Sequence, residues 1–363
     1  MGHVLVSPLN WGLGHATRDI PVIESLLTHN HDVTIAATGN ALTILKKEFP
    51  TIRFIDFPDY PIWYSGNRFF LPKFFASFPL ILKGLSEERK MLAAILAKDR
   101  YDLIISDNRL GVYSPDVPSV FISHQLHYHL PVMLWPAELL GIGMNGFLHS
   151  KFRKIIVPDN PPGPLSLAGK LSQPGTDETR TRAYYAGILT STHRRVIPED
   201  LDYLVMISGP EPQRTRLEEI LLPQVHELEG ECVVLLGSPG HRGNKKIQPG
   251  CSIVPFATTE EKELLMNRAR FVICRSGYTT VMELAELGKK QALFIPTPGQ
   301  TEQEYLSWYY EEKGWFHSKS QYKLDLAGDI AMAHGFSGFP DVPVTAGNVE
   351  RLYNNVFVPY LEP

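Results

Sequence analysis

The chain of 363 residues lacks the features that mark several classes of protein. It has only three cysteines, each inside or beside an apolar run, so we expect buried thiols in a reducing compartment and no disulfide framework. It has no apolar run of about 18 residues, so no membrane-spanning helix is expected. No basic segment with an apolar stretch precedes the first strand-like run, so a secretory signal is not indicated. These absences predict a cytoplasmic protein.

The chain also lacks an excess of charge of either sign. Its net charge of -4 creates no field that attracts a polyanion, so nucleic acid is not an expected partner. Apolar residues make up 44% and charged residues 20%, which is typical of globular proteins and excludes a disordered or fibrous chain. Because the length exceeds that of one ordinary core, we expect two domains with a cleft between them.

Short apolar runs alternate with segments of helical period along the first half of the chain. The run at 3–7 precedes a helical segment at 14–27, and the runs at 103–106 and 119–123 show no polar alternation, as in strands buried on both faces. The last strand of this sheet is expected at 155–158. The alternation predicts the α/β class, with a parallel sheet covered by helices on both faces.

The composition changes after residue 158. Residues 159–177 are rich in proline and glycine, which indicates a domain boundary, and the alternation restarts with an apolar run at 204–207. The expected division is an N-terminal domain over 1–165, a linker and the start of the second domain over 166–198, a C-terminal domain over 199–340, and a segment over 341–363 that packs back on the N-terminal domain. Ligands are expected beyond the carboxyl ends of the strands, in the cleft between two doubly wound domains.

The strongest motif follows the strand predicted at 271–274. Arg275, Ser276 and Gly277 end this strand and lead directly into a helix, whose free backbone N–H groups and positive dipole end form an anion site. Glu283 lies one turn into the helix, where a carboxylate can accept hydrogen bonds from two ribose hydroxyls. Ordinary packing of a helix on a sheet around a glycine turn is the alternative interpretation.

The same stretch resembles the UDP-sugar signature of the MurG-like glycosyltransferases, family 28, whose GT-B fold has two Rossmann-like domains facing across a cleft. The resemblance rests on the pattern Arg-Ser-Gly-x-x-Thr-Val-x-Glu-Leu-Ala at 275–285, Phe-Ile-Pro at 294–296 and the glutamine-rich helix start at 300–304, and it is close over about 255–310. It implies sugar transfer from a UDP-sugar, such as a UDP-GlcNAc-like donor, to an acceptor hydroxyl. It also implies inversion at the anomeric carbon, with neither a metal nor a cofactor.

The resemblance further implies a donor site in the second half of the chain. Glu283 would hold the ribose, Gln303 would bind the sugar hydroxyls, and the backbone of Phe256 and Ala257 would read the base edge. The family usually has two adjacent glutamines where this chain has Gln303 and Glu304, so the identity of the sugar stays open. The remaining expected donor residues are Ser208, Gly209, Arg275, Ser276, Gly277, Thr279, Thr280, Gln300 and Glu304.

Ser208 and Gly209 form a second strand-to-helix turn, at the end of the strand predicted at 204–207. Their N–H groups can bind a diphosphate, as the corresponding glycine-rich turn of the family does. Pro210 and Pro212 remove two further donors from this turn.

The turn that joins the first strand to the first helix contains Gly12, Gly14 and His15. It is not a dinucleotide fingerprint, because Thr17 stands where the third glycine should be. The resemblance places this turn on the acceptor side of the cleft. A histidine at a helix N-terminus stays neutral and can accept a proton, so His15 is either the general base or a purely structural residue.

Polar residues also follow two of the predicted strands. Asp107, Asn108 and Arg109 follow the strand at 103–106, and we expect Asp107 to assist His15 and the other two to bind the acceptor, together with His124. A metal is not expected at the His124-x-x-His-x-His run, because no carboxylate or cysteine accompanies it at ligand spacing.

Residues 68–83 combine five phenylalanines with three cationic side chains. Such a segment can lie at a membrane interface, as in family members that use lipid acceptors, or pack beside the cleft, and two prolines interrupt its helical period. The expected acceptor is therefore a small molecule, a glycan or a lipid-linked sugar. Two other functions stay open, a nucleotide-sugar epimerase of the same fold and a non-catalytic sugar-nucleotide binding protein.

Overall fold

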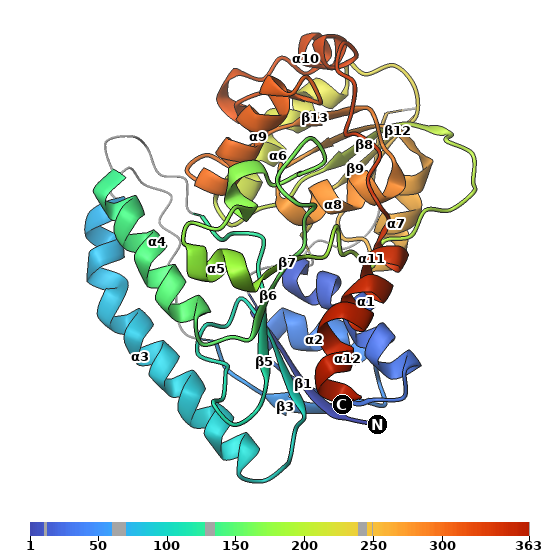
Figure 1. The fold of residues 1–363 in the computed structure, drawn as a ribbon. Helices are drawn as coiled ribbons and strands as arrows, with labels where there is room; N and C mark the ends of the chain where they lie inside the picture. The colour runs from blue at the N-terminus through green and yellow to red at the C-terminus, as the bar shows by residue number, and fades with distance from the viewer. Residues whose placement is uncertain (11–12, 60–69, 128–134, 239–244, 249, 363) are drawn as a thin grey trace. The chain divides into compact units, whose positions relative to one another are not determined.

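The computed structural model describes residues 1–10, 13–59, 70–127, 135–238, 245–248 and 250–362. The chain forms two compact units, one made of Met1–Ser191 with Val342–Pro363 and the other of Thr192–Asp341. Each unit contains one seven-stranded sheet between layers of helices (Figure 1), so the α/β class predicted from the sequence is confirmed. No helix in the described part of the chain is long and apolar enough to cross a membrane.

The sheet of the first unit is parallel throughout, in the order β3-β2-β1-β4-β5-β6-β7. Its strands are β1 (His3–Pro8), β2 (Asp32–Ala37), β3 (Arg53–Asp56), β4 (Leu103–Asp107), β5 (Ser119–Ile122), β6 (Lys154–Val157) and β7 (Ala183–Tyr185). The helices are α1 (Leu13–Thr28), α2 (Gly39–Glu48), α3 (Phe70–Leu96), α4 (Trp135–His149) and α5 (Asp177–Arg182). The strand order reverses between β1 and β4, and this switch point opens a crevice at their carboxyl ends.

The C-terminal residues of the chain belong to the first unit. Helix α11 (Thr345–Leu352), a π-helical turn (Tyr353–Phe357) and α12 (Val358–Leu361) contribute apolar side chains to the core that β1 and α1 also line. The Tyr353 hydroxyl lies 2.7 Å from His31 Nε2 and ties this segment to the start of β2. In Figure 1 the red C-terminal helices lie beside the blue α1.

The second unit has the strand order β10-β11-β9-β8-β12-β13-β14, in which β10 alone is antiparallel to its neighbour. Its strands are β8 (Leu201–Met206), β9 (Cys232–Leu235), β10 (Lys245–Gln248), β11 (Cys251–Val254), β12 (Ala269–Cys274), β13 (Ala292–Phe294) and β14 (His317–Ser318). The helices are α6 (Gln213–Val225), α7 (Thr259–Arg268), α8 (Tyr278–Leu287), α9 (Thr301–Glu312) and α10 (Leu326–Ala333). The switch point of this sheet lies between β8 and β12, the two strands that precede the predicted phosphate turns.

Two features differ from the sequence-based expectations. The first sheet does not end at 155–158, because β7 pairs with β6 and the segment 166–191, expected as a linker, belongs to the first unit. Proline and glycine in this segment serve turns around the buried Asp159, whose carboxylate accepts hydrogen bonds from Ser166 and Ser172. The second difference is α3, which continues from Phe70 through the prolines to Leu96, and whose last turns bury Leu92 in the core.

Candidate functional site

His15 and Asp107 meet at the switch point of the first sheet. Helix α1 begins directly after β1, and Asp107 ends the neighbouring β4, where it is in register with Pro8. The Nδ1 atom of His15 lies 2.9 Å from Asp107 Oδ1, and both side chains are buried or nearly so. The sequence therefore predicted a pair of residues that the fold brings into contact.

Three further buried side chains complete a group that we call the His15 cluster: His15, Arg18, Asp19, Asp107 and His124. The guanidinium of Arg18 bonds both oxygens of Asp107, with Nε 2.6 Å from Oδ2, and its Nη1 lies 3.2 Å from His124 Nδ1. Arg18 Nη2 also lies 2.9 Å from His15 Nδ1. The sequence analysis assigned no role to Arg18 or Asp19, although their spacing from His15 places all three on one face of α1.

The protonation of the cluster follows from burial and from its one cation. Burial lowers the pKa of His15 below its usual value, and the charge of Asp107 opposes this only in part, so His15 is neutral near pH 7. Burial alone would raise the pKa of Asp107, but the charge of Arg18 and the hydrogen bonds from Arg18 and His15 outweigh burial and hold the pKa of Asp107 below its usual range. The cluster thus contains a neutral imidazole against an ionised carboxylate.

The acceptor residues expected beside this cluster are placed differently from one another. Gly12 lies outside the described residues, and Gly14 lies in the first turn of α1. Asn108 adopts a left-handed backbone conformation with φ of 55°, which asparagine tolerates better than most residues, and its N–H donates to Ile122 O. Arg109 is the exception, because its side chain is completely buried.

The guanidinium of Arg109 is a structural centre of the first unit. It donates to the carbonyl oxygens of Pro8, Phe57 and Pro58 and to the carboxylates of Asp59 and Glu88. These bonds use all five of its N–H donors, which favours a structural role over the expected binding of an acceptor. A polar residue after a buried strand can equally well brace the loops around it, and the sequence pattern does not distinguish the two uses.

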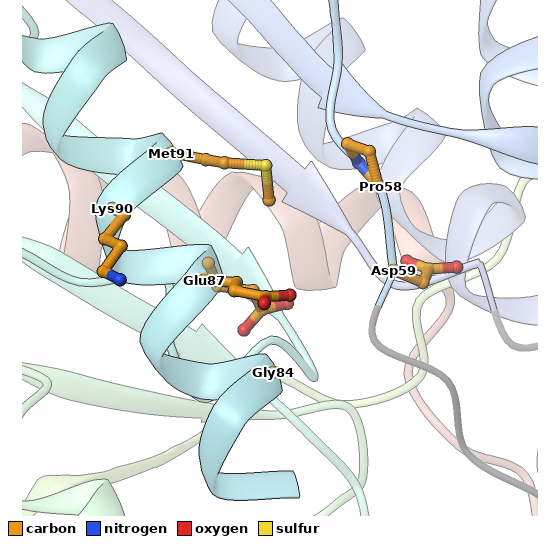
Figure 2. Close-up of a pocket in the computed structure, with 7 residues that line it drawn as sticks. Pro58, Asp59, Gly84, Glu87, Lys90 and Met91 are labelled. Carbon is orange, nitrogen blue, oxygen red and sulfur yellow. The ribbon is translucent and has the colours of Figure 1, made fainter. Parts of the chain in front are cut away.

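A cavity of about 370 Å³ lies beside this arginine network. In Figure 2 the loop that carries Pro58 and Asp59 lies opposite the α3 side chains of Glu87, Lys90 and Met91. Burial raises the pKa of Glu88 in the cavity wall to about 7, although the charge and hydrogen bond of Arg109 oppose the shift. Neither this cavity nor the role of Glu88 was predicted from the sequence.

In the second unit, the turn after β12 has the predicted form. Gly277 is the N-cap of α8 and, since glycine has no side chain, it makes no capping hydrogen bond to the first N–H groups of the helix. The Ser276 hydroxyl donates to Gln303 O and accepts from Ser307, each at 2.9 Å, which fastens α9 to the end of β12. The Ser276 side chain therefore holds the scaffold, while the helix end remains an anion site.

Arg275 lies beneath the turn and is 2% exposed. Its guanidinium donates to four carbonyl oxygens, those of Gln213, Ser208, Ile295 and Pro296. Burial lowers the pKa of Arg275 to about 10. No carboxylate in the described residues pairs with this cation, so its positive charge is uncompensated at the end of β12.

The turn after β8 lies close to Arg275. Gly209 has a φ of 118°, a conformation that favours glycine, and a Cβ built on it would lie 3.9 Å from Arg275 Nε and 3.5 Å from Thr297 Oγ1. Thr297 is 1% exposed, and its hydroxyl has no hydrogen-bond partner among the described residues. The sequence analysis assigned no role to Thr297, because only the fold brings it against Gly209.

Glu283 is buried in α8 and paired with Lys262 of α7, whose Nζ lies 2.6 and 2.7 Å from the two carboxylate oxygens. A carboxylate has about four acceptor positions, so this pair leaves capacity for hydroxyl donors. Lys262 was not predicted. The turn of α7 that carries it is fixed by a capping box between Thr258 and Glu261.

The start of α9 holds the loop before it. Gln303 Oε1 accepts from Thr297 N at 2.8 Å, Gln303 Nε2 bonds Gln300 at 2.5 Å, and Glu304 accepts from Gly299 N at 2.9 Å. These three side chains thus shape the loop between β13 and α9 in the absence of a ligand. Thr279 and Thr280 lie in the first turn of α8, and Phe256 is about half exposed and next to Ala257, after β11.

Comparison with known proteins adds to this geometry. Residues 238–314 match the glycosyltransferase family 28 C-terminal domain, a span that contains the turn after β12, Glu283 and the start of α9. The spinosyn rhamnosyltransferase SpnG matches over 98% of this chain and 96% of its own, with 14% identity and a TM-score of 0.66. The fold is GT-B. No curated protein shows significant sequence similarity to the chain.

Other GT-B structures are similar to a comparable degree. A glycotransferase of kitacinnamycin matches over 97% of this chain and 94% of its own, with 13% identity and a TM-score of 0.65. The structure of MurG from Acinetobacter baumannii matches over 92% of this chain and 90% of the MurG chain, with 15% identity and a TM-score of 0.53. SpnG has also been solved with thymidine diphosphate and with the spinosyn aglycone. The family 28 domain and the GT-B fold predicted from the sequence are thus confirmed.

Proposed function

We propose that this chain is a metal-independent glycosyltransferase that moves a sugar from a UDP-sugar to an acceptor hydroxyl, with inversion at the anomeric carbon. The observation that carries the proposal is the match of 238–314 to the family 28 domain, at the part of the second unit where a helix with a glycine N-cap begins beside a buried cation. Both features favour an anionic ligand such as the diphosphate of a nucleotide sugar.

The donor residues take their roles from this geometry. The N-terminal N–H groups of α8 and the Gly209 turn bind the diphosphate. Backbone carbonyl oxygens hold the guanidinium of Arg275 beneath these turns, and its positive charge attracts the diphosphate from there. Arg275 is therefore not a direct cationic ligand in this proposal, in contrast to the expectation from the sequence. Glu283 holds the ribose hydroxyls, with Thr279 and Thr280 nearby. Gln303 and Glu304 bind the sugar, and for this they give up their hydrogen bonds to the backbone of the loop before α9.

The chemistry is a single displacement. The acceptor oxygen attacks the anomeric carbon, the bond from that carbon to the diphosphate oxygen breaks, and UDP departs with the bonding electron pair. When Nδ1 of His15 carries the ring proton and donates a hydrogen bond to Asp107, Nε2 has no proton and takes the one that the acceptor hydroxyl loses. The helix N–H groups stabilise the charge that develops on the leaving phosphate.

Two aspects of specificity belong to the proposal. The sugar is a hexose or an N-acetylhexosamine, and the pentose is ribose, because Glu283 can accept bonds from two hydroxyls. The base is uracil, on the strength of the similarity to the family 28 domain. SpnG has been solved with thymidine diphosphate, so dTDP is the competing nucleotide to test. The acceptor is a small molecule, a glycan or a lipid-linked sugar. A membrane contact through 68–83 is part of this proposal: residues 68 and 69 lie outside the described residues, and in the described part Leu80 and Leu82 are each about half exposed.

A thermal-shift screen tests the donor assignment. A ligand at 100 times its dissociation constant adds about 2.7 kcal/mol to the stability of the folded protein. We expect UDP to raise the melting temperature strongly, dTDP less, and ADP not at all. Equal shifts with UDP and ADP would remove the uridine assignment, and no shift with any nucleoside diphosphate would remove the transferase assignment.

Product analysis then separates transfer from the other functions. The chain is incubated with UDP-GlcNAc and UDP-glucose, each with and without a panel of hydroxyl acceptors, and the nucleotides are separated by chromatography. Release of UDP that depends on an acceptor supports transfer. A changed sugar on intact nucleotide would instead identify an epimerase, and binding without any turnover would identify a binding protein.

A further inference from the structure

Asp19 is a buried carboxylic acid that the proposed mechanism does not use. It lies on α1 one turn after His15, and its side chain is completely inaccessible to solvent. Neither of its oxygens receives a hydrogen bond from a donor group in the described residues. Its carboxyl group contacts that of Asp107, which ends β4. A buried carboxyl without donors, placed against another carboxyl, needs a physical explanation.

The charges around Asp19 supply this explanation. One cation faces the pair of carboxyl groups, Arg18 from the same helix, and its guanidinium is directed at the two oxygens of Asp107. His15 faces Asp107 as well. Nη1 of Arg18 is directed at Nδ1 of His124, which follows β5 in the chain. Among the described residues, the two donors of the cluster that reach a carboxylate, Arg18 and His15, are therefore both directed at Asp107. A second ionised carboxylate beside it would be buried without compensation, so Asp19 retains its proton.

A protonated Asp19 has one hydrogen-bond donor, and Asp107 is the acceptor that it contacts. Burial and the charge of Asp107 both raise the pKa of Asp19 well above its usual value, which agrees with a neutral carboxyl at neutral pH. The two carboxyl groups then resemble the pairs that share one proton in other buried sites, where like charges cannot both persist.

We propose that Asp19 is a positioning residue of the proposed transferase, whose protonated carboxyl donates a hydrogen bond to Asp107 and so limits how strongly Asp107 attracts the proton of His15. The inference rests on the proposed function for its catalytic consequence. A hydrogen bond to Asp107 spreads part of the negative charge of that carboxylate onto Asp19. Asp107 then stabilises the imidazolium form of His15 less, and His15 stays neutral and able to accept the acceptor proton at neutral pH.

Isotope-edited infrared spectroscopy of the full chain tests the protonation directly and needs no substrate. With labelled aspartate, the wild-type spectrum at pH 7 should contain the C=O stretch of a protonated carboxyl, and Asp19→Asn should remove it. Asp107→Asn is the companion variant: it removes the charge that keeps the proton on Asp19, so the band of the protonated carboxyl should disappear there as well. If Asp19→Asn removes an ionised carboxylate band, the inference is overturned.

The pH profile of kcat/KM tests the positioning role. The acid limb of this profile is the pH range in which kcat/KM rises as His15 loses its proton. Asp19→Asn keeps a donor of similar size and should not move this limb. Asp19→Leu removes the donor, so the limb that reports His15 should move to higher pH by about one unit, which is about a tenfold loss of kcat/KM at a pH on that limb. UDP affinity should not change in either variant. A purely structural role predicts instead equal losses at all pH values and a lower melting temperature, without movement of the limb.

The two experiments fail in distinguishable ways. If the wild-type chain transfers no sugar, the proposed function is wrong, but the infrared bands still show whether the carboxyl group of Asp19 is protonated. If transfer is found but Asp19→Asn moves the acid limb as far as Asp19→Leu does, the positioning role falls and the transferase assignment stands. Should Asp19→Leu fail to fold, the wild-type and Asp19→Asn spectra and profiles still carry the test, because an Asn that cannot replace the donor would move the limb by itself.

Discussion

The buried arginines of the two units have different partners. In the first unit, buried cations meet carboxylates: Arg18 is paired with Asp107, and Arg109 with Glu88 and Asp59. In the second unit, the buried Arg275 meets only carbonyl oxygens among the described residues. The first unit thus balances the charge of these arginines internally, which suits proton transfer. At the end of β12 the charge of Arg275 remains, which suits an anionic ligand that arrives from solution.

The largest expected effect comes from removing the base of the first unit while leaving the second intact. His15→Ala should lower kcat/KM by about 100-fold to 10,000-fold, because general-base catalysis contributes about this much. UDP affinity, measured by calorimetry, should stay within about twofold. A parallel loss of UDP affinity would show that the two functions are not divided between the units as described here.

Replacing the central cation of the first unit should affect folding and not ligand binding. Arg109→Met leaves Glu88 and Asp59 buried without their cation, at a cost of about 3–5 kcal/mol in the free energy of unfolding. Urea unfolding at pH 7 measures this loss. Arg275→Met is the matched variant in the second unit, and it alone should lower the affinity for UDP. If Arg109→Met folds normally and raises KM for the acceptor, Arg109 is a binding residue after all.

The raised pKa of Glu88 gives the first unit a stability that depends on pH. The pKa of this carboxyl is about 7 in the folded protein and 4.5 in its ordinary state, so the folded protein binds more protons between these values. Stability should therefore fall as the pH rises from about 4.5 to about 7, by at most about 3 kcal/mol. Urea unfolding of Glu88→Gln at pH 5 and pH 7.5 should show a smaller difference than the wild type. An unchanged difference would assign the pH dependence to other groups.

The smallest expected effect is at Thr297 in the second unit. Its buried hydroxyl has no partner among the described residues, so Thr297→Val removes an unsatisfied polar group at nearly constant volume and should leave the melting temperature unchanged or slightly higher. The control is Thr345→Val in the first unit, where the hydroxyl accepts from Thr190 N and donates to Ile188 O. The control should lose about 1 kcal/mol. Equal losses in both would mean that the Thr297 hydroxyl is bonded.

The sequence predicted what is local and missed what depends on packing. The turn at 275–277 and the helix after it were predicted because a strand end, a glycine and a helical period are adjacent in the chain. The contact of His15 with Asp107 was also predicted, since the carboxyl ends of neighbouring parallel strands lie together. By contrast, Lys262 pairs with Glu283, and Arg109 pairs with Glu88, each across 21 residues of sequence. The helical and strand periods of the sequence relate only residues that are a few positions apart, so they do not predict such pairs.

Two misses have a more specific physical cause. The helix α3 runs through prolines that a local rule treats as breaks, and it is held in part by apolar side chains of its last turns, such as Leu92. The neutral state of Asp19 was invisible in the sequence, because an aspartate on a helix is normally solvated and ionised. Only its complete burial against Asp107 changes that expectation.

The most direct test of the account is a crystal structure of the chain with UDP. The account predicts the diphosphate at the N-terminal N–H groups of α8 beside Gly209, and the ribose hydroxyls at the carboxylate of Glu283. A nucleotide bound elsewhere, with Glu283 held only by Lys262 and the end of α8 covered by protein side chains, would contradict it.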